Sequence, residues 1–178
     1  MDAGNTAEVL NLFIKACLNM KDGGAEGIVL CVNTMHMFAD DIEQATGLPV
    51  IHIAEATADA IKKQGLDKVA LLGTRPTMEQ DFYTKKLAAK GISALIPNDE
   101  DREFIHHTIF EELGKGLFTE PTKSRYISII NDLVGQGAQG AILGCTEIPM
   151  LLTQADLTVP AFDTTKIHSA AAVAFSLG

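Results

Sequence analysis

The sequence predicts an α/β fold built on a mostly parallel sheet. Short apolar runs alternate along the chain with segments whose apolar residues recur at helical spacing. Most of these runs end at a glycine or at small polar residues. Because strands that alternate with helices pair in parallel through right-handed crossovers, this pattern indicates a parallel sheet. The length of 178 residues, 47% of them hydrophobic, suffices for one domain or for two small ones sharing a boundary.

Helices are expected where apolar residues repeat every three or four positions and a glycine ends the pattern. In the first helix, Phe13 and Cys17 lie on one apolar stripe, so Cys17 is expected in the core. Gly23, Gly47 and Gly65 end the first three helices. The expected helices are Thr6–Lys21, Met35–Thr46, Glu55–Gln64, Met78–Lys90, Asp99–Gly114, Pro121–Gly135 and Thr164–Ser176.

Strands are expected in the short apolar runs between these helices, and a loop is expected at Thr74–Thr77. The motif Gly-Ala-(Glu/Gln)-Gly precedes two of the strands, at Gly24–Gly27 and Gly137–Gly140, which suggests that two parts of the chain follow one βα plan. The expected strands are Gly27–Val32, Pro49–Ile53, Lys68–Leu72, Gly91–Ile96, Gly140–Leu143 and Val159–Phe162.

Composition and charge exclude several classes of protein. The net charge of −9 argues against nucleic-acid binding, and an anionic substrate would need local cations or amide donors to hold it. The sequence contains no apolar run long enough for a membrane span and no signal-peptide pattern. The three cysteines, Cys17, Cys31 and Cys145, are typical of free thiols in a reducing compartment, so we expect a cytoplasmic protein. Their spacing does not suggest a metal site.

The stretch Gly140–Met150 carries the strongest functional signal. An apolar run ends at Gly144, Cys145 follows at once, and Thr146 and Glu147 begin a predicted helix. Ligands of α/β sheets bind at the carboxyl ends of strands, and a helix N-terminus lowers the pKa of a thiol. We therefore expect Cys145 to be a reactive thiol. Glu147 would either raise the pKa of the thiol or, as a proton acceptor, orient it. The alternative interpretation of Cys145 is a buried structural cysteine.

A second stretch, Gly27–His36, repeats this design, with Asn33 and Thr34 at the strand end. These two side chains are candidate donors to a substrate carboxylate, or they cap the next helix. Further candidates are Thr74 and Thr77 in a turn beyond a strand, where backbone amides bind anions, although such residues are also ordinary in turns. Thr146 offers an amide and a hydroxyl. His36 is expected to cap or pack, and His52 and His168 are expected in supporting roles. His106 and His107 are expected on a solvated helix face.

Two motifs, Asn33-Thr-Met-His36 and Gly144-Cys-Thr-Glu-Ile-Pro149, resemble the signatures of the cofactor-independent aspartate/glutamate racemases. Supporting matches are Leu72–Thr77, Phe82-Tyr83 and Phe162–His168. The resemblance implies two similar Rossmann-like or flavodoxin-like α/β domains with parallel sheets and an active site in the cleft between them. It implies that residues 1–48 and 160–178 form the first domain and residues 49–159 the second. It also implies an amino-acid substrate and no cofactor.

The sequence departs from the family in two places. The family's usual first strand and Gly-rich loop would precede Thr6 and are absent, so we expect an N-terminally shortened chain. The sheet edge that this leaves open predicts a homodimer. The family generally uses two cysteines, and Cys145 matches one, whereas Val32 stands at the other position. Valine has no proton to give. Cys31 would serve instead only if the strand register slipped by one residue.

The resemblance places one more residue in the site and leaves three functions open. Lys123 falls where the family carries a basic residue for the distal carboxylate, and the alternative is an exposed lysine at a helix start. The first function is racemisation of aspartate or glutamate with Cys145 as acid/base, weakened by Val32. The second is a one-base enzyme of the same superfamily, and the third is an inactive carboxylate-binding homologue.

Overall fold

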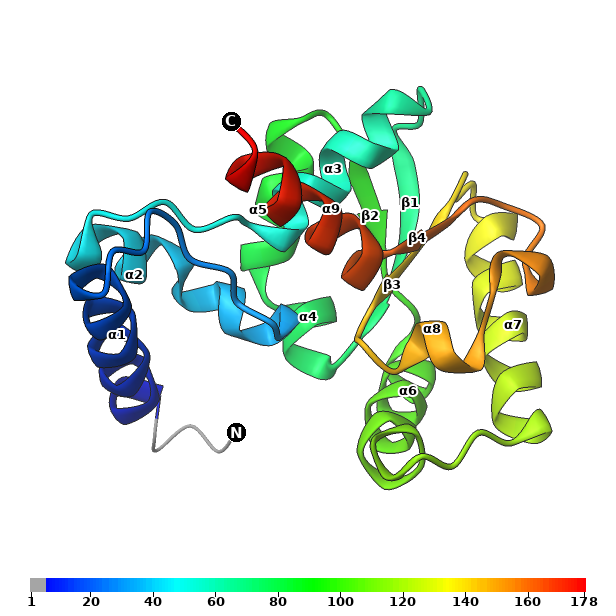
Figure 1. The fold of residues 1–178 in the computed structure, drawn as a ribbon. Helices are drawn as coiled ribbons and strands as arrows, with labels where there is room; N and C mark the ends of the chain where they lie inside the picture. Colours follow the sequence, from blue (N-terminus) through cyan, green and yellow to red (C-terminus); the bar gives the residue numbers. More distant parts are fainter. Residues whose placement is uncertain (1–5) are drawn as a thin grey trace.

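A computed structural model describes residues 6–178 and contains a four-stranded sheet (Figure 1). Its strands are β1 (Lys68–Gly73), β2 (Ser93–Leu95), β3 (Ala141–Gly144) and β4 (Ala161–Asp163). They pair in the order β2-β1-β3-β4, and every pairing is parallel. The prediction of an α/β fold with a parallel sheet is therefore confirmed. Since β1 and β3 are central, their carboxyl ends lie side by side, with Gly73 opposite Gly144.

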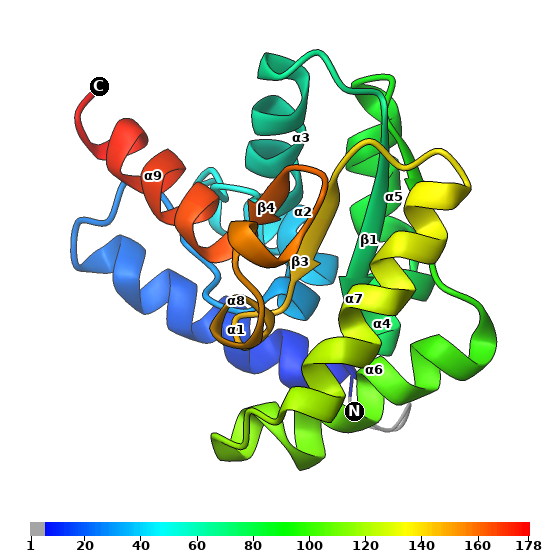
Figure 2. The same ribbon diagram turned by 90° about the vertical axis from the view of Figure 1, so that its right-hand side faces the viewer.

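Helices cover both faces of this sheet (Figure 2). Alternate residues of β1 point to opposite faces, as the pleat requires. Ala70 and Leu72 pack against α6 (Asp99–Glu111) and α7 (Glu120–Gly135), whereas Val69 and Leu71 pack against the helices of the other face. Those helices are α3 (Ile53–Lys63), α5 (Asp81–Ala89) and α9 (Thr164–Ser176). Burial on both faces explains why β1 and β3 are continuous apolar runs.

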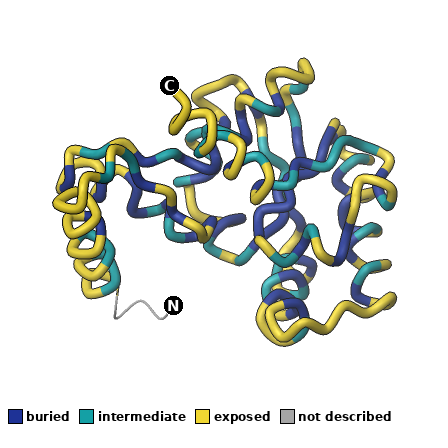
Figure 3. Tube along the Cα trace, in the orientation of Figure 1, coloured by how far each residue is buried: buried dark blue, intermediate teal, exposed yellow. Residues whose placement is uncertain are grey.

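The N-terminal part of the chain has an apolar cluster of its own. It comprises α1 (Thr6–Asp22), the 3-10 helix η1 (Asn33–Phe38) and α2 (Ala39–Thr46), whose buried side chains gather around Cys17, Ile28 and Ile42. Cys17 is buried, as predicted. Figure 3 shows that most of the outer surface of α1 is exposed. A separate cluster is compatible with a second domain, but the division into two domains stays a prediction.

The expected strands at Gly27–Val32 and Pro49–Ile53 are wrong in extent. The two segments share a single parallel bridge, Ile28 with Val50, held by the bonds from Ile28 N to Pro49 O and from Ile51 N to Ile28 O, each 2.9 Å long. A longer strand would need a continuous ladder of backbone partners, which the rest of these segments lack within the described residues. The segment after residue 28 is therefore extended without being part of the sheet.

Several helix starts also differ from prediction. The expected loop at Thr74–Thr77 is the beginning of α4 (Arg75–Glu79), because Pro76 occupies the first turn, where its missing N–H costs nothing. After β3, α8 (Ile148–Leu151) begins at Ile148 rather than at Thr146. Two short 3-10 helices, η2 (Leu113–Lys115) and η3 (Gln154–Asp156), complete the structure. In residues 6–178, no helix combines the length and apolar character that crossing a membrane requires.

Candidate active site

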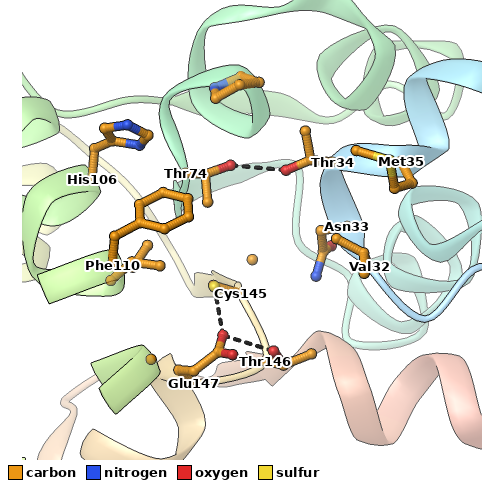
Figure 4. A pocket seen from close by; sticks show the side chains of 14 residues that line it. Val32, Asn33, Thr34, Met35, Thr74, His106, Phe110, Cys145, Thr146 and Glu147 are labelled. Atoms are coloured by element: carbon orange, nitrogen blue, oxygen red, sulfur yellow. Dashed lines mark hydrogen bonds between the residues drawn. The ribbon is translucent and has the colours of Figure 1, made fainter. Parts of the chain in front are cut away.

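A pocket of about 470 Å³ opens where β1 and β3 end (Figure 4). Three segments build it: one before and within η1, one after β1 and one after β3, while α6 and the start of η2 form the fourth side. Its lining residues are Val32, Asn33, Thr34, Met35, Thr74, Pro76, His106, Ile109, Phe110, Gly114, Gly144, Cys145, Thr146 and Glu147. Residues of the Asn33–His36 motif and of the Gly144–Pro149 motif therefore line the same pocket.

The floor of the pocket depends on close backbone contact between β1 and β3. A Cβ atom on Gly144 would lie 2.6 Å from Leu72 O, and one on Gly73 would lie 2.8 Å from Gly144 O. Real Cβ atoms do not approach backbone oxygens so closely, so the two strand ends can be adjacent only because both residues are glycine. This contact fixes where Cys145 leaves the sheet.

Cys145 is buried at the pocket floor beside a carboxylate. Its Sγ donates a hydrogen bond to Glu147 Oε2 at 2.9 Å, and Thr146 Oγ1 donates to the same oxygen at 2.7 Å. Burial, first, and the hydrogen bond to Glu147, which favours the thiol, together raise the pKa of Cys145 to about 12. Burial alone would raise the pKa of Glu147, but the two donors outweigh it and lower the pKa. The pair is thus a thiol beside a carboxylate.

The prediction of a lowered pKa for Cys145 is therefore wrong in this structure. It assumed a helix starting directly after the thiol, whereas α8 starts at Ile148 and has only four residues. Desolvation and the Glu147 carboxylate both act in the opposite direction, toward the protonated thiol. The second predicted possibility, that Glu147 accepts from the thiol and orients it, agrees with the hydrogen bond that is formed.

Hydroxyl groups from the other two segments lie across the pocket from Cys145. Thr34 Oγ1 is 2.9 Å from Thr74 Oγ1, which in turn is 3.1 Å from Thr77 Oγ1. Thr34 and Thr74 line the pocket, but Thr77 is fully buried behind them and is not among the lining residues. Thr77 can therefore orient the other two hydroxyls. The bond between Thr34 and Thr74 also joins the N-terminal part to the end of β1 (Figure 4).

Asn33 is held in one orientation by a buried chain of hydrogen bonds. Thr164 Oγ1 donates to Leu143 O at 2.9 Å, so it must accept from Asn33 Nδ2, which lies 3.2 Å away. That chain uses one of the two amide N–H groups, and among residues 6–178 it leaves Asn33 Oδ1 buried without a partner. The role of Asn33 as a side-chain donor to a carboxylate stays a prediction, because the second N–H of its amide is not used by this chain of bonds.

Three buried histidines join the N-terminal part to the sheet. The ring centroid of His36 in η1 lies 4.9 Å from that of His52 at the start of α3 and 5.2 Å from that of His168 in α9. His36 Nδ1 lies 3.1 Å from Val32 O, and because a carbonyl only accepts, Nδ1 carries the proton and Nε2 is left without a partner. Burial, first, and the neighbouring imidazoles lower the pKa of His36 to about 3. The cluster is therefore neutral at pH 7, and the expected supporting roles fit a structural contact.

Comparison with known proteins agrees with this geometry. Residues 2–172 match the Asp/Glu/hydantoin racemase family. This protein belongs to that family. A crystal structure of a "putative Asp/Glu Racemase" from Yersinia pestis is 49% identical, with a TM-score of 0.93 over 98% of this chain and 76% of that one. An aspartate racemase homologue from Pyrococcus horikoshii OT3 is 35% identical, with a TM-score of 0.88 over 99% of this chain and 78% of that one. The broad specificity amino-acid racemase RacX of Bacillus subtilis (strain 168) is 25% identical over 88% of this chain and 67% of its own.

Val32 lies at one wall of the pocket. Val32 is extended, with φ −133° and ψ 123°, and its side chain lines the pocket although it is 52% exposed. Cys31 is exposed and is not a lining residue. The alternative in which a register slip turns Cys31 toward the site is therefore not what this structure contains.

Lys123 lies outside the pocket. It is not a lining residue, and its Nζ forms an ion pair with Asp156 Oδ1 at 2.7 Å. The bond to Asp156 raises the pKa of Lys123, which keeps the ammonium group charged and engaged. The alternative of an exposed lysine at a helix start fits the position of Lys123 near the start of α7, but the side chain is half-buried and paired.

Sequence reasoning missed the side of the pocket that α6 provides. His106 was expected on a solvated helix face, yet it lines the pocket together with Ile109 and Phe110. The i, i+4 spacing of His106 and Phe110 puts them on one helix face, with ring centroids 5.0 Å apart. That spacing is visible in the sequence, but nothing there indicates that this face turns toward Cys145. Among residues 6–178, no group of three or more His, Cys, Asp or Glu side chains is placed to hold a metal ion.

Proposed function

We propose that this chain removes and returns the α-proton of an amino acid without a cofactor, with Cys145 as the acid/base group. The observation that carries the proposal is the buried Cys145 thiol, which donates to Glu147 at the floor of a pocket lined by hydroxyl groups. General acid–base groups of this kind contribute about 10²–10⁴-fold each. Membership of a racemase family supports the same chemistry. Aspartate and glutamate, the acidic amino acids that the resemblance implies, are the first substrates to test.

The protonated thiol must become a thiolate before it can accept an α-proton. In the empty pocket, burial and Glu147 oppose this step. A bound amino acid brings an α-ammonium group, and a cation beside Sγ lowers the pKa of the thiol. Glu147 accepts the proton that Sγ releases, and the thiolate then takes the α-proton. The Cys145 thiol returns a proton to the carbanion, and Glu147 gives its proton back to Sγ, which restores the starting pair. A thiolate whose protonated form has a high pKa is also a stronger base once formed.

The substrate's α-carboxylate would be held on the side of the pocket opposite Cys145. Thr34 and Thr74 offer hydroxyls that can donate to a carboxylate, with Thr77 orienting them, and Thr146 offers a further hydroxyl beside the thiol. Asn33 lines the same pocket, and one of its two amide N–H groups is not used by the bond to Thr164. Donors placed around the carboxylate would stabilise the negative charge that develops when the α-proton leaves.

Val32 decides between two forms of this chemistry. A racemase needs an acid/base group on each face of the α-carbon, and the wall opposite Cys145 presents methyl groups at Val32. We therefore propose that inversion is slow and that proton exchange with retention is faster. This observation favours the second candidate, a one-base enzyme of the superfamily. An inactive carboxylate-binding homologue would show neither inversion nor exchange.

Proton exchange in heavy water tests the proposal directly. L- and D-aspartate and L- and D-glutamate are incubated with the protein in D₂O, and loss of the α-proton is followed by NMR while a chiral assay follows inversion. We expect exchange to exceed inversion. Equal rates of exchange and inversion would mean that a second proton donor exists, and the absence of exchange with any amino acid would refute the proposed activity.

A further inference from the structure

We propose that the pocket takes an amino acid with an uncharged, apolar side chain in preference to a dicarboxylate. The inference rests on the proposed function, since it concerns the same site, and it names the substrate class. Its basis is the contrast between the two ends of the pocket in Figure 4. Asn33 and Thr34 lie at one end, whereas His106 and Phe110 lie at the other, on α6.

No cation lines the pocket among the described residues. The titratable groups of its lining are Cys145, Glu147 and His106. The Glu147 carboxylate is anionic, and in a protein of net charge −9 the overall field also repels anions. The distal carboxylate of aspartate or glutamate would therefore enter a space that already holds one negative charge. Desolvating a carboxylate without a positive partner is costly, so the binding of a dicarboxylate would be weak.

Basic residues near the pocket are engaged elsewhere. Arg75 pairs with Glu103, Lys115 pairs with Glu111 at 2.5 Å, and Lys123 pairs with Asp156 at 2.7 Å. His106 supplies no charge, because burial, first, and Arg75 lower its pKa. Its Nδ1 accepts a hydrogen bond from Arg75 N at 3.1 Å, which leaves only a neutral N–H at Nε2.

The α6 side instead offers an apolar surface for a side chain. Phe110, Ile109 and Pro76 line the pocket there, and the Phe110 ring is 56% exposed in the absence of a ligand. Its ring packs against the His106 imidazole at an interplanar angle of 68°, which holds it in place. An aromatic ring at a pocket wall gains from burial against an apolar partner. A side chain such as that of methionine, leucine or phenylalanine would cover this ring, whereas a carboxylate would not.

A substrate panel tests the preference with two readouts. Binding of L-methionine, L-leucine and L-phenylalanine is compared with that of L-aspartate and L-glutamate by ligand-observed NMR, and α-proton exchange in D₂O is measured for the same compounds. We expect the apolar amino acids to bind and exchange on the order of tenfold better. Phe110→Lys should improve the binding and exchange of glutamate by a similar factor, because it places a cation at the wall that the substrate side chain meets. Phe118→Lys adds the same charge to an exposed phenylalanine outside the pocket and should change nothing.

Each result decides between the preference and the activity. Faster exchange of aspartate or glutamate than of every apolar amino acid would overturn the preference and leave the proposed function intact. Preferential binding of apolar amino acids without exchange would support the preference and refute the function. If no amino acid binds, both fall. A Phe110→Lys variant that is folded by circular dichroism but gains nothing with glutamate would show that the substrate side chain does not meet α6, and would overturn the inference.

Discussion

Residues 24–36 and residues 137–148 follow the same sequence pattern but take different structures. Both have a Gly-Ala-(Glu/Gln)-Gly motif, an apolar run and a polar end. The second becomes β3, paired on both sides, and its end is fixed by the Gly73–Gly144 contact. The first is attached through the single bridge between Ile28 and Val50. The wall of the pocket that carries Cys145 is therefore positioned by the sheet, whereas the wall that carries Val32 is positioned by side-chain contacts such as that of Thr34 with Thr74.

The proposed proton chemistry takes place at the Cys145 wall, so removing the Cys145 thiol should have the largest effect on activity. We expect Cys145→Ser to lower α-proton exchange by about 10²–10⁴-fold, because a hydroxyl is a far weaker acid at this position. Deuterium incorporation measured by NMR gives the rate. Cys31→Ser makes the same change at an exposed position outside the pocket and should retain the parent rate. Exchange that survives in Cys145→Ser would place the base elsewhere.

Giving the Val32 wall a thiol should make the two walls chemically alike. Val32→Cys is expected to raise inversion by about 10²–10⁴-fold, since a second acid/base group then faces the α-carbon. The side chains are similar in size, so the fold should accept the change. Val29→Cys, on the same segment but not in the pocket lining, is the matched control. Equal inversion by the parent and by Val32→Cys would show that the second proton already has another source.

Acid should separate the two walls, because the three histidines join them. Burial lowers the pKa of His36 to about 3 and that of His52 to about 4, while the unfolded chain keeps values near 6.5. The stabilisation that these neutral histidines contribute is therefore fully present above about pH 6.5. It is lost as the pH falls toward their folded-state pKa values. Lowering the pH from 7 to 5 reduces the free energy of unfolding by on the order of 2 kcal/mol for each of these two histidines.

Urea unfolding at pH 7 and pH 5 measures this loss, and exchange activity should fall with it. His36→Gln should make the free energy of unfolding less dependent on pH. His107→Gln, at an exposed position on α6, should leave that dependence unchanged. If the free energy of unfolding of the parent is the same at both pH values, the histidines are not neutral in the folded state.

A smaller effect is expected within the Cys145 wall. Because the Glu147 carboxylate helps to raise the pKa of Cys145, Glu147→Gln should lower that pKa. Each pKa unit increases the thiolate fraction about tenfold at pH 8, so alkylation of Cys145 by iodoacetamide should accelerate by on the order of tenfold. Glu120→Gln, at the exposed start of α7, serves as the control. Unchanged or slower alkylation would mean that Glu147 does not set the protonation of the thiol.

The smallest effect is expected at Lys123, which belongs to neither wall. Lys123→Ala should leave the ratio of aspartate to alanine binding unchanged, because its ammonium group is engaged with Asp156 outside the pocket. Titration of both ligands by NMR gives the ratio. A selective loss of aspartate binding would bring Lys123 back into the site as a partner for the distal carboxylate.

The sheet was predictable because its signals are local. Lys68–Leu72 and Gly140–Leu143 are apolar runs that end at glycine, and both are central strands. β1 is one residue longer than predicted, and β3 is shifted by one residue. The prediction failed for Gly27–Val32, where the run is equally apolar but a ladder partner is not available beyond Ile28. Strand formation depends on neighbours that local sequence does not specify.

Within the site, the motif residues were predictable and their environment was not. Cys145, Asn33 and Thr34 line the pocket as expected. The direction of the Cys145 pKa shift was missed, because it depends on burial and on the conformation that brings Glu147 to the thiol. His106 was missed because the orientation of α6 toward the strand ends arises from packing of distant residues against the sheet.

The glycine contact at the pocket floor has a consequence for how such a protein can diversify. Gly73 and Gly144 touch so closely that neither can acquire a side chain without moving a strand end. Selection for a new substrate therefore has little to work with at the floor, where the chemistry is located. Phe110 is exposed on a helix that packs on the sheet from one side, so it can vary without displacing Cys145. Reactivity and selectivity are carried by separate elements, and one can change through mutation while the other is conserved.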